Sequence, residues 1–219
     1  MPYGMEIIND YGTILLDHSY NNLAMVSKGS VTTARDSPAS EDVAIYSAYI
    51  GTALLSGERL AIACSTAFAT FFCETDAVYV CTGGATAVVE WYRFGTPAPS
   101  TTNNAGLRVY NASGQLTFDS NHNQARVHSS VTSEAATPVG TTGRKYAVIL
   151  ARRGHGHSTV RLPDPIVGGF YNTPILKATG VKIDGVNVSF GRVTWSSTGG
   201  GTDFESPAFR AHIIDVTGY

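Results

Sequence analysis

Residues 105–129 read AGLRVYNASGQLTFDSNHNQARVHS, and residues 3–27 read YGMEIINDYGTILLDHSYNNLAMVS. The two stretches align without a gap at an offset of 102 residues. The identical positions are Gly4 with Gly106, Asn9 with Asn111, Gly12 with Gly114, Asp17 with Asp119, Asn21 with Asn123 and Ser27 with Ser129. These identities fall on turn residues, and the apolar positions between them also coincide. The sequence therefore predicts an internal duplication.

Each copy predicts a β-hairpin. Apolar residues alternate with others around a four-residue turn, Asn9–Gly12 in one copy and Asn111–Gly114 in the other, and a period of two is typical of strands. The Asn that opens such a turn can hydrogen-bond its own backbone, and the Gly that closes it adopts a positive φ at low cost. We assign the same structural role to Gly4 and Gly106, which precede the hairpins.

An aspartate follows each hairpin, at Asp17 and Asp119. A carboxylate at this place can accept hydrogen bonds from the backbone N–H groups of the next turn. A catalytic role would need a partner acid or base that repeats with the aspartate, and none does. We therefore expect both residues to be structural.

The ends of the two copies also correspond. Residues 87–95 and 209–219 are both alternating segments that reach a glycine near their ends. Between the copies, residues 97–104 contain two prolines and no charged or large apolar residue, a composition typical of an extended linker. The sequence thus predicts an N-terminal β domain at 1–96, a linker at 97–104 and a C-terminal β domain at 105–219, each a β-sandwich.

The remaining segments predict an all-β protein. They are short and rich in Val, Ile, Thr, Tyr and Phe, and turn residues separate them. Asp184-Gly185 between two alternating runs is a strong hairpin signal. The expected strands lie at 43–50, 52–55, 59–64, 67–73, 77–81, 86–94, 145–151, 181–183, 186–188 and 192–196, with a loop before Phe170 and Tyr171.

Charge and hydropathy exclude several function classes. Of the 219 residues, 15% are charged and the net charge is -2, so bulk charge does not favour binding to nucleic acid or to a membrane surface. No window approaches the ~18 apolar residues of a membrane-spanning helix. The N-terminus lacks a basic region followed by an apolar run. We expect no nucleic-acid partner, no membrane insertion and synthesis in a cytoplasm.

The three cysteines lie close together at Cys64, Cys73 and Cys81. Their spacing matches no common zinc pattern, and no CxxC pair exists. We expect them to be small buried side chains in strands, while a disulfide between neighbouring strands and a catalytic thiol remain open alternatives.

One polar run stands out, Arg152-Arg153-Gly154-His155-Gly156-His157. In a strand, His155 and His157 would share a face, as in some metal sites, but no acidic or cysteine ligand stands beside them. We expect an exposed loop and assign no metal, although the arginines offer an anion contact. Surface recognition by loops 152–157, 168–172 and 197–204 is the related hypothesis. Its candidate residues are Arg152, Arg153, His155, His157, Tyr171 and Asp203.

Catalytic motifs are absent. The sequence has no GxSxG elbow, P-loop, HExxH or EF-hand loop, and a carboxylate pair such as Asp203 and Glu205 does not by itself indicate a glycosidase. We expect no enzyme activity, no catalytic residues and no cofactor. Aromatic residues leave two roles open, filling the core or contacting a carbohydrate or protein; those considered are Trp91, Tyr92, Tyr171, Trp195 and Tyr219.

At the hairpin motif the chain is similar to a known family. Residues 3–9 and 106–120 resemble the start of small tail proteins of tailed bacteriophages, which typically open with YGLxVYNxxGxxxxDS. Residues 212–219, HIIDVTGY, resemble their closing strand. The first half departs from the pattern at Tyr11, Leu15 and His18 and lacks the closing Thr-Gly-Tyr.

The resemblance implies an all-β virion component that assembles as a symmetric oligomer and has no catalytic residues. We therefore expect a structural protein of a phage tail, at the tail tip, baseplate or fibre. Its expected partners are other tail proteins and further copies of itself, as a trimer or hexamer, with a possible host surface receptor. The alternative is a receptor-binding adhesin that recognises a host surface glycan or pilus through its loops. A polysaccharide depolymerase is the least favoured reading.

Overall fold

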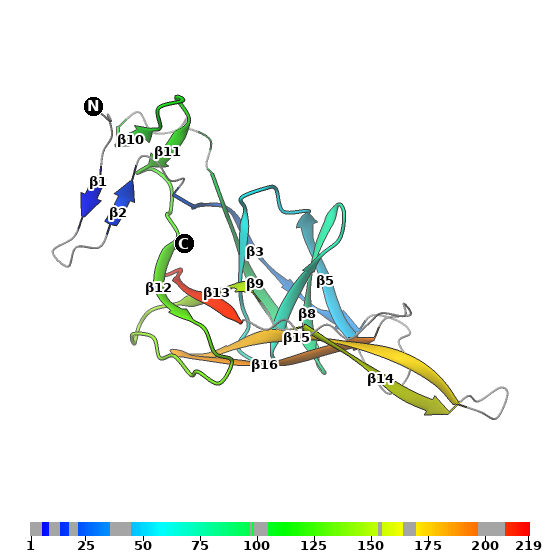
Figure 1. Ribbon diagram of the computed structural model, residues 1–219. Coiled ribbons are helices and arrows are strands. Elements are labelled where there is room, and N and C mark those ends of the chain that lie inside the picture. Colours follow the sequence, from blue (N-terminus) through cyan, green and yellow to red (C-terminus); the bar gives the residue numbers. More distant parts are fainter. Residues whose placement is uncertain are drawn as a thin grey trace.

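The computed structural model describes residues 6–8, 14–17, 22–35, 45–96, 98, 105–152, 155–163, 170–196 and 209–219. These residues form strands β1 to β17 and contain no helix (Figure 1), which confirms the all-β prediction. The strands of the first half are β1 (Glu6–Ile8), β2 (Ile14–Asp17), β3 (Ala24–Thr32), β4 (Ala34–Arg35), β5 (Ile45–Thr52), β6 (Arg59–Ala63), β7 (Ala69–Cys73), β8 (Ala77–Gly83) and β9 (Val88–Gly95). Those of the second half are β10 (Arg108–Tyr110), β11 (Leu116–Asp119), β12 (Arg126–Val131), β13 (Tyr146–Arg152), β14 (His155–Pro163), β15 (Phe170–Asp184), β16 (Asn187–Ser196) and β17 (Arg210–Asp215).

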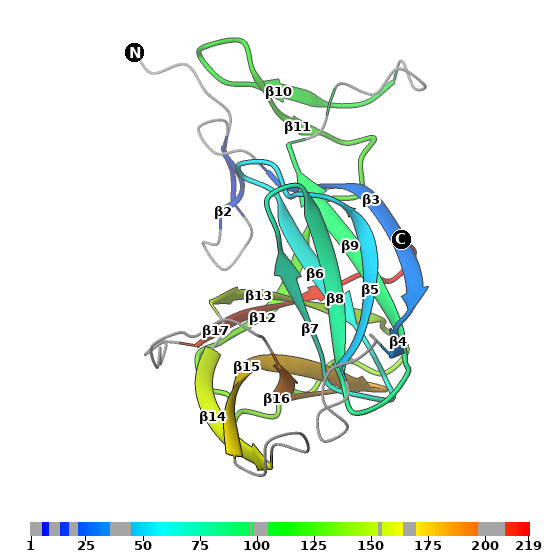
Figure 2. The same ribbon diagram turned by 90° about the vertical axis from the view of Figure 1, so that its right-hand side faces the viewer.

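Two large antiparallel sheets make up the body (Figure 2). One has the order β12-β17-β13-β6-β9-β3, and the other has the order β14-β15-β7-β8-β5-β4, with β16 also paired to β15. A core of buried aliphatic side chains lies between them, and its members come from both sheets. They include Leu60, Ile62, Val78, Val80, Val148, Val181, Val188 and Ile213.

The six-stranded sheet contains three strands from each half of the chain. Counted inward from the two edges, β3, β9 and β6 of the first half correspond to β12, β17 and β13 of the second half. The central strands β6 and β13 are antiparallel, with Ala61 opposite Ile149. The sheet therefore has an approximate two-fold axis through its central pair.

The duplication extends to irregularities of register. The β3–β9 ladder shifts between Met25 and Ser27, and the β12–β17 ladder shifts between Val127 and Ser129. The hairpins β1–β2 and β10–β11 also shift at equivalent places, at Ile7/Ile8 and Val109/Tyr110. Bulges are features that the local sequence specifies, so the two halves share backbone geometry as well as residue pattern.

The two halves are joined within both sheets, through β13 with β6 and β15 with β7. The linker boundaries at 97–104 stay a prediction, but the separate sandwich expected for each half is replaced by one that both halves build. The reason is that three strands from one half leave an unpaired edge and a bare apolar face. The corresponding strands of the other half cover both.

The six-stranded sheet also curls. Its edge strands meet at their first residues, where Ala24 bridges Gln124 and the N–H of Ala125 donates to the carbonyl of Leu23 at 2.7 Å. A second apolar cluster fills this side of the sheet and includes Tyr92, Phe94, Ala147, Ile149 and Ile214. The curl closes one end of the sheet over its own face.

Most strands lie where alternation predicts them, but β15 and β16 are much longer than expected. The predicted Asp184-Gly185 hairpin is confirmed, because β15 ends at Asp184, β16 starts at Asn187 and Gly185 has a φ of 61°. Residues 53–55, by contrast, form no strand. The structure extends β15 back to Phe170, where the prolines and glycines of 163–169 had indicated a loop.

Candidate functional site

The hairpin β10–β11 confirms the predicted turn chemistry. The carbonyl oxygen Oδ1 of Asn111 accepts hydrogen bonds from the backbone N–H groups of Ser113 at 3.0 Å and Gln115 at 2.9 Å. Gly114 has a φ of 75°. Gly106 also has a positive φ, and a Cβ there would lie 2.7 Å from both Ser120 Oγ and Asn121 Nδ2. These residues fix the shape of the hairpin.

Asp119 lies where the hairpin ends, and its side chain is fully buried. Its Oδ1 accepts from the backbone N–H of Asn121 at 2.9 Å, as predicted. Its Oδ2 lies 3.0 Å from Nε of Arg108, a partner on the opposite strand that sequence reasoning missed. The cross-strand pairing of β10 with β11 is what brings the two together.

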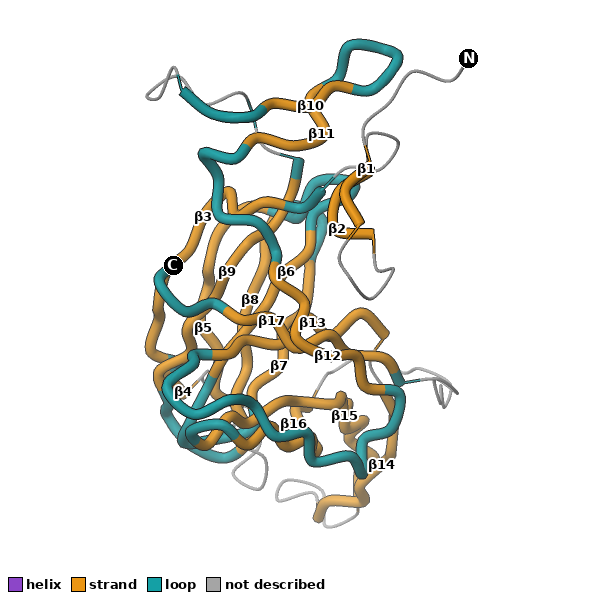
Figure 3. Tube along the Cα trace, turned by 90° about the vertical axis from the view of Figure 1, so that its left-hand side faces the viewer, coloured by secondary structure: helices purple, strands orange, loops and turns teal. Residues whose placement is uncertain are grey.

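The first copy has the same pairing, with Glu6 opposite Asp17 where Arg108 is opposite Asp119. Gly4, Asn9 and Gly12 lie outside the described residues, and for Asp17 only the backbone is described. Figure 3 shows both hairpins at the same end of the molecule. The structural roles expected for the first copy stay predictions.

The closing segment folds back onto the start of β12. Gly218, with a φ of 80°, turns the chain so that the hydroxyl of Tyr219 donates to the carbonyl of Gln124. Nε of Arg126 donates to that hydroxyl at 3.1 Å, and the guanidinium lies 4.6 Å from the ring centroid. We call Gln124, Arg126, Asp215, Thr217 and Tyr219 the C-terminal latch.

Asp215 holds the latch electrostatically. Its Oδ1 accepts from the N–H of Thr217 at 2.9 Å, and Arg144 and Arg126 lie at 3.2 and 3.8 Å. Burial raises the pKa of this carboxyl, but the hydrogen bonds of Thr217 and the two guanidinium charges outweigh it, so the pKa lies below its ordinary value. Gln124 also donates through Nε2 to the carbonyl of Asp119 at 2.9 Å. The latch is therefore tied directly to the hairpin.

The predicted recognition residues are distributed differently from the expected loops. His155 and His157 belong to β14, and Tyr171 belongs to β15, so the loop expected at 152–157 is wrong from His155 onward. Strand pairing with 170–178 supplies backbone partners that local sequence does not reveal. Arg152 is exposed and ends β13. Arg153 and Asp203 lie outside the described residues.

Strands β14 and β15 form a long hairpin arm, paired from His155–Ala178 to Pro163–Phe170. In Figure 1 this arm extends away from the rest of the body, at the lower right. Its first strand begins at His155, three positions after Arg152, the last residue of β13.

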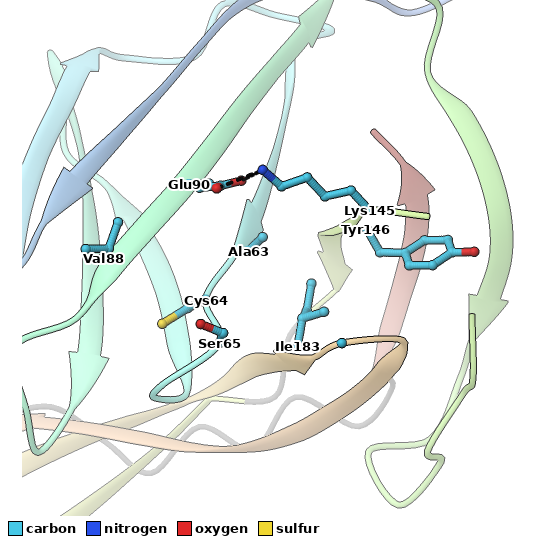
Figure 4. A pocket seen from close by; sticks show the side chains of 9 residues that line it. Ala63, Cys64, Ser65, Val88, Glu90, Lys145, Tyr146 and Ile183 are labelled. Carbon is cyan, nitrogen blue, oxygen red and sulfur yellow. Dashed lines mark hydrogen bonds and ion pairs between the residues drawn. The ribbon is translucent and has the colours of Figure 1, made fainter. Parts of the chain in front are cut away.

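A pocket of about 210 Å³ lies where β6, β9 and β13 approach the β15–β16 turn (Figure 4). Nζ of Lys145 crosses it to Glu90, at 2.8 Å from Oε2, and the hydroxyl of Tyr92 donates to the same oxygen at 2.9 Å. Burial and the Glu90 carboxylate raise the pKa of Tyr92 well above its ordinary value. The Lys145–Glu90 pair joins the two halves of the chain and leaves the carboxylate already neutralised.

Lowering the pH should destabilise the folded protein, because Glu90 and Asp215 become protonated. Burial raises the pKa of Glu90, but the hydrogen bonds of Lys145 and Tyr92 and the charges of Lys145 and Lys28 lower it more, so the pKa of Glu90 lies below its ordinary value. The folded state then binds fewer protons than the unfolded chain, and stability is lost as pH falls through the folded pKa. We expect the urea midpoint to drop as the pH falls from about 5 to about 3.

In Glu90→Gln that acid-dependent loss should be smaller than in the parent chain, and Glu74→Gln, an exposed carboxylate at the end of the β7 strand, serves as control. Parallel pH profiles of the parent chain and Glu90→Gln would contradict the assignment.

Two of the three cysteines have buried side chains. Cys64 and Cys81 are buried, as predicted, but Cys73 is exposed, and none of the three forms a disulfide. Cys64 lines the pocket, and its Sγ lies 3.9 Å from the hydroxyl of Thr66. Among the described residues it has no ionic partner. Of the aromatic candidates whose side chains the structure describes, Tyr92 is buried and Trp91 and Tyr219 are half-buried against the core. The side chains of Tyr171 and Trp195 lie outside the described part.

Some features are absent from the part of the chain that the structure describes. It contains no helix long and apolar enough to cross a membrane. It also brings no three His, Cys, Asp or Glu side chains together in a group that could hold a metal ion. No protein-family model, curated protein or solved structure matches the chain.

Proposed function

We propose that the chain is a structural protein of a bacteriophage tail, at the tip, baseplate or fibre, which assembles with other tail proteins and with further copies of itself. The supporting observation is that the two stretches with tail-protein resemblance, 106–120 and 212–219, form one connected unit. Gln124 links them, since it donates to Asp119 and accepts from Tyr219. The motif thus corresponds to one physical element rather than to two unrelated similarities.

The test is location in the particle. Gold-labelled antibody raised against the purified chain should decorate the tails of phage particles whose genome encodes it, and light scattering should give a trimer or hexamer. Antibody absorbed with the purified chain is the control. Particles that carry no label, although their heads and tails are complete, would overturn the proposal.

The second candidate is a receptor-binding adhesin, and the projecting β14–β15 arm favours it. The hairpin extends away from the body in Figure 1, and a projecting hairpin is suited to reaching another surface. The arm equally suits docking into a neighbouring copy. The two roles differ in what the particle loses when the arm is shortened.

An arm-shortened variant separates them. Thr159 and Pro174 are opposite one another in register, so joining them through Asn-Gly should retain a hairpin. If the arm binds the host, particles should form normally and adsorption should fall about tenfold or more. If the arm docks a neighbouring subunit, tails should fail to assemble. Normal particles with normal adsorption would exclude both roles for the arm.

A further inference from the structure

Two arginines face each other at one end of the six-stranded sheet. Arg152 of β13 and Arg210 of β17 are Cα partners in the antiparallel ladder, directly after the register shift between Leu150 and Arg152, and both side chains are exposed. Neither forms an ion pair or side-chain hydrogen bond with any residue that the structure describes. Like charges opposite each other on neighbouring strands destabilise a sheet. The repulsion between these two arginines is not compensated by an acidic side chain among the described residues.

Two further polar groups lie beside this pair. His212 follows Arg210 at the next position on the same face of β17, and Ser130 of β12 is opposite His212. Oγ of Ser130 and Nδ1 of His212 are 2.8 Å apart. Burial lowers the pKa of His212 below its ordinary value, and the charge of Arg210 adds to this effect. Arg210 is therefore near enough for its charge to act on the imidazole of His212.

The first half of the chain shows the contrast. The two-fold relation places Glu90 where the second half has Arg210, Tyr92 where it has His212, and Lys28 where it has Ser130. Glu90 is neutralised by Lys145. The duplicated position is therefore charge-balanced in one half and carries unbalanced positive charge in the other, although the chain as a whole has a net charge of -2.

We propose that Arg152 and Arg210 bind a phosphate group, with the hydroxyl of Ser130 and the imidazole of His212 at its margin. A guanidinium presents paired N–H donors that match phosphate oxygens. Two guanidiniums supply two positive charges, which suits a phosphate dianion better than a carboxylate. A bound phosphate also removes the repulsion between them. The ligand class we assign is therefore a phosphate dianion. A phosphate on a bacterial surface polysaccharide is the source that we test, and this choice of source rests on the proposed function.

The test uses the purified full-length chain and inorganic phosphate as the probe. Phosphate should shift the backbone NMR signals around residues 150–152 and 210–212 and raise the pKa of His212, read from its ring protons. Arg152→Gln and Arg210→Gln should each weaken phosphate binding at least about tenfold. Both variants should fold, because each replaces one exposed arginine of a like-charged cross-strand pair. Arg35→Gln, an exposed arginine on β4, is the matched control and should bind as the parent does.

Equal phosphate affinity in the parent, Arg152→Gln and Arg210→Gln would overturn the site. A second experiment identifies the source of the phosphate. Parent protein should bind immobilised phosphorylated lipopolysaccharide, and binding should disappear after phosphatase treatment and in Arg210→Gln. Binding to inorganic phosphate without binding to the polysaccharide would overturn the assignment to a surface glycan and leave free phosphate as the ligand. None of these readouts depends on tail assembly, so this inference and the proposed function can fail separately.

Discussion

Replacing Gly180 with alanine should lower the free energy of unfolding by about 3 kcal/mol. A Cβ at this position would lie 2.5 Å from Cγ2 of Val193 and 2.9 Å from the carbonyl oxygen of Ala69. The oxygen belongs to the backbone of β7, so it cannot move without disturbing the place where β7 meets β15. The cost therefore falls on the junction between the two halves.

Urea unfolding of Gly180→Ala measures this cost, and Gly83→Ala is the matched control. A Cβ at Gly83 would have its nearest neighbours at 3.7 Å or more, so that variant should stay within about 1 kcal/mol of the parent. If the two variants were equally stable, the close approach of β7 and β15 would be wrong.

Removing the Tyr219 side chain should cost about 2 to 3 kcal/mol. Tyr219→Ala loses the hydrogen bond to Gln124, the contact with the Arg126 guanidinium and a ring contact with Phe94, whose centroid is 6.4 Å away. Because Gln124 also holds Asp119, we expect the loosening to reach hairpin β10–β11.

Thermal unfolding measures the loss of stability, and limited proteolysis within residues 105–125 measures the loosening of the hairpin. Tyr219→Phe keeps the ring and removes only the hydroxyl, so it should cost about 1 kcal/mol. Because the lost hydroxyl is the group that holds Gln124, the hairpin should become more sensitive to protease in this variant as well. A Tyr219→Ala variant with the stability of the parent and a protected hairpin would show that the latch is not needed.

Local chemistry explains what could be predicted from the sequence. Asn111, Gly114 and Asp119 act on residues within a few positions of themselves, so their roles follow from spacing alone. The equal bulges in the two halves follow from the duplication. The partners Arg108 and Arg126 were missed because cross-strand register and chain reversal decide them, and neither leaves a periodic signal.

The arrangement of the sheets could not be predicted for a related reason. Alternation indicates that β6 and β13 are strands, but it does not say which strands become neighbours. Likewise, the prolines and glycines of 163–169 gave a loop signal that hid the two long strands beside it. The pair of Arg152 with Arg210 depends on residues 58 positions apart in the chain. Only tertiary structure brings such residues together.

The two-fold relation about Ala61 and Ile149 means that one polypeptide contains what two identical chains would otherwise have to build. A gene for a single repeat would encode a protein with an open strand edge at β6 and an apolar face in contact with water, and two copies could close both on each other. In such a pair every substitution appears twice. Fusion into one chain removes that constraint, so the first half can keep Glu90, which Lys145 of the second half neutralises, while the second half acquires Arg210.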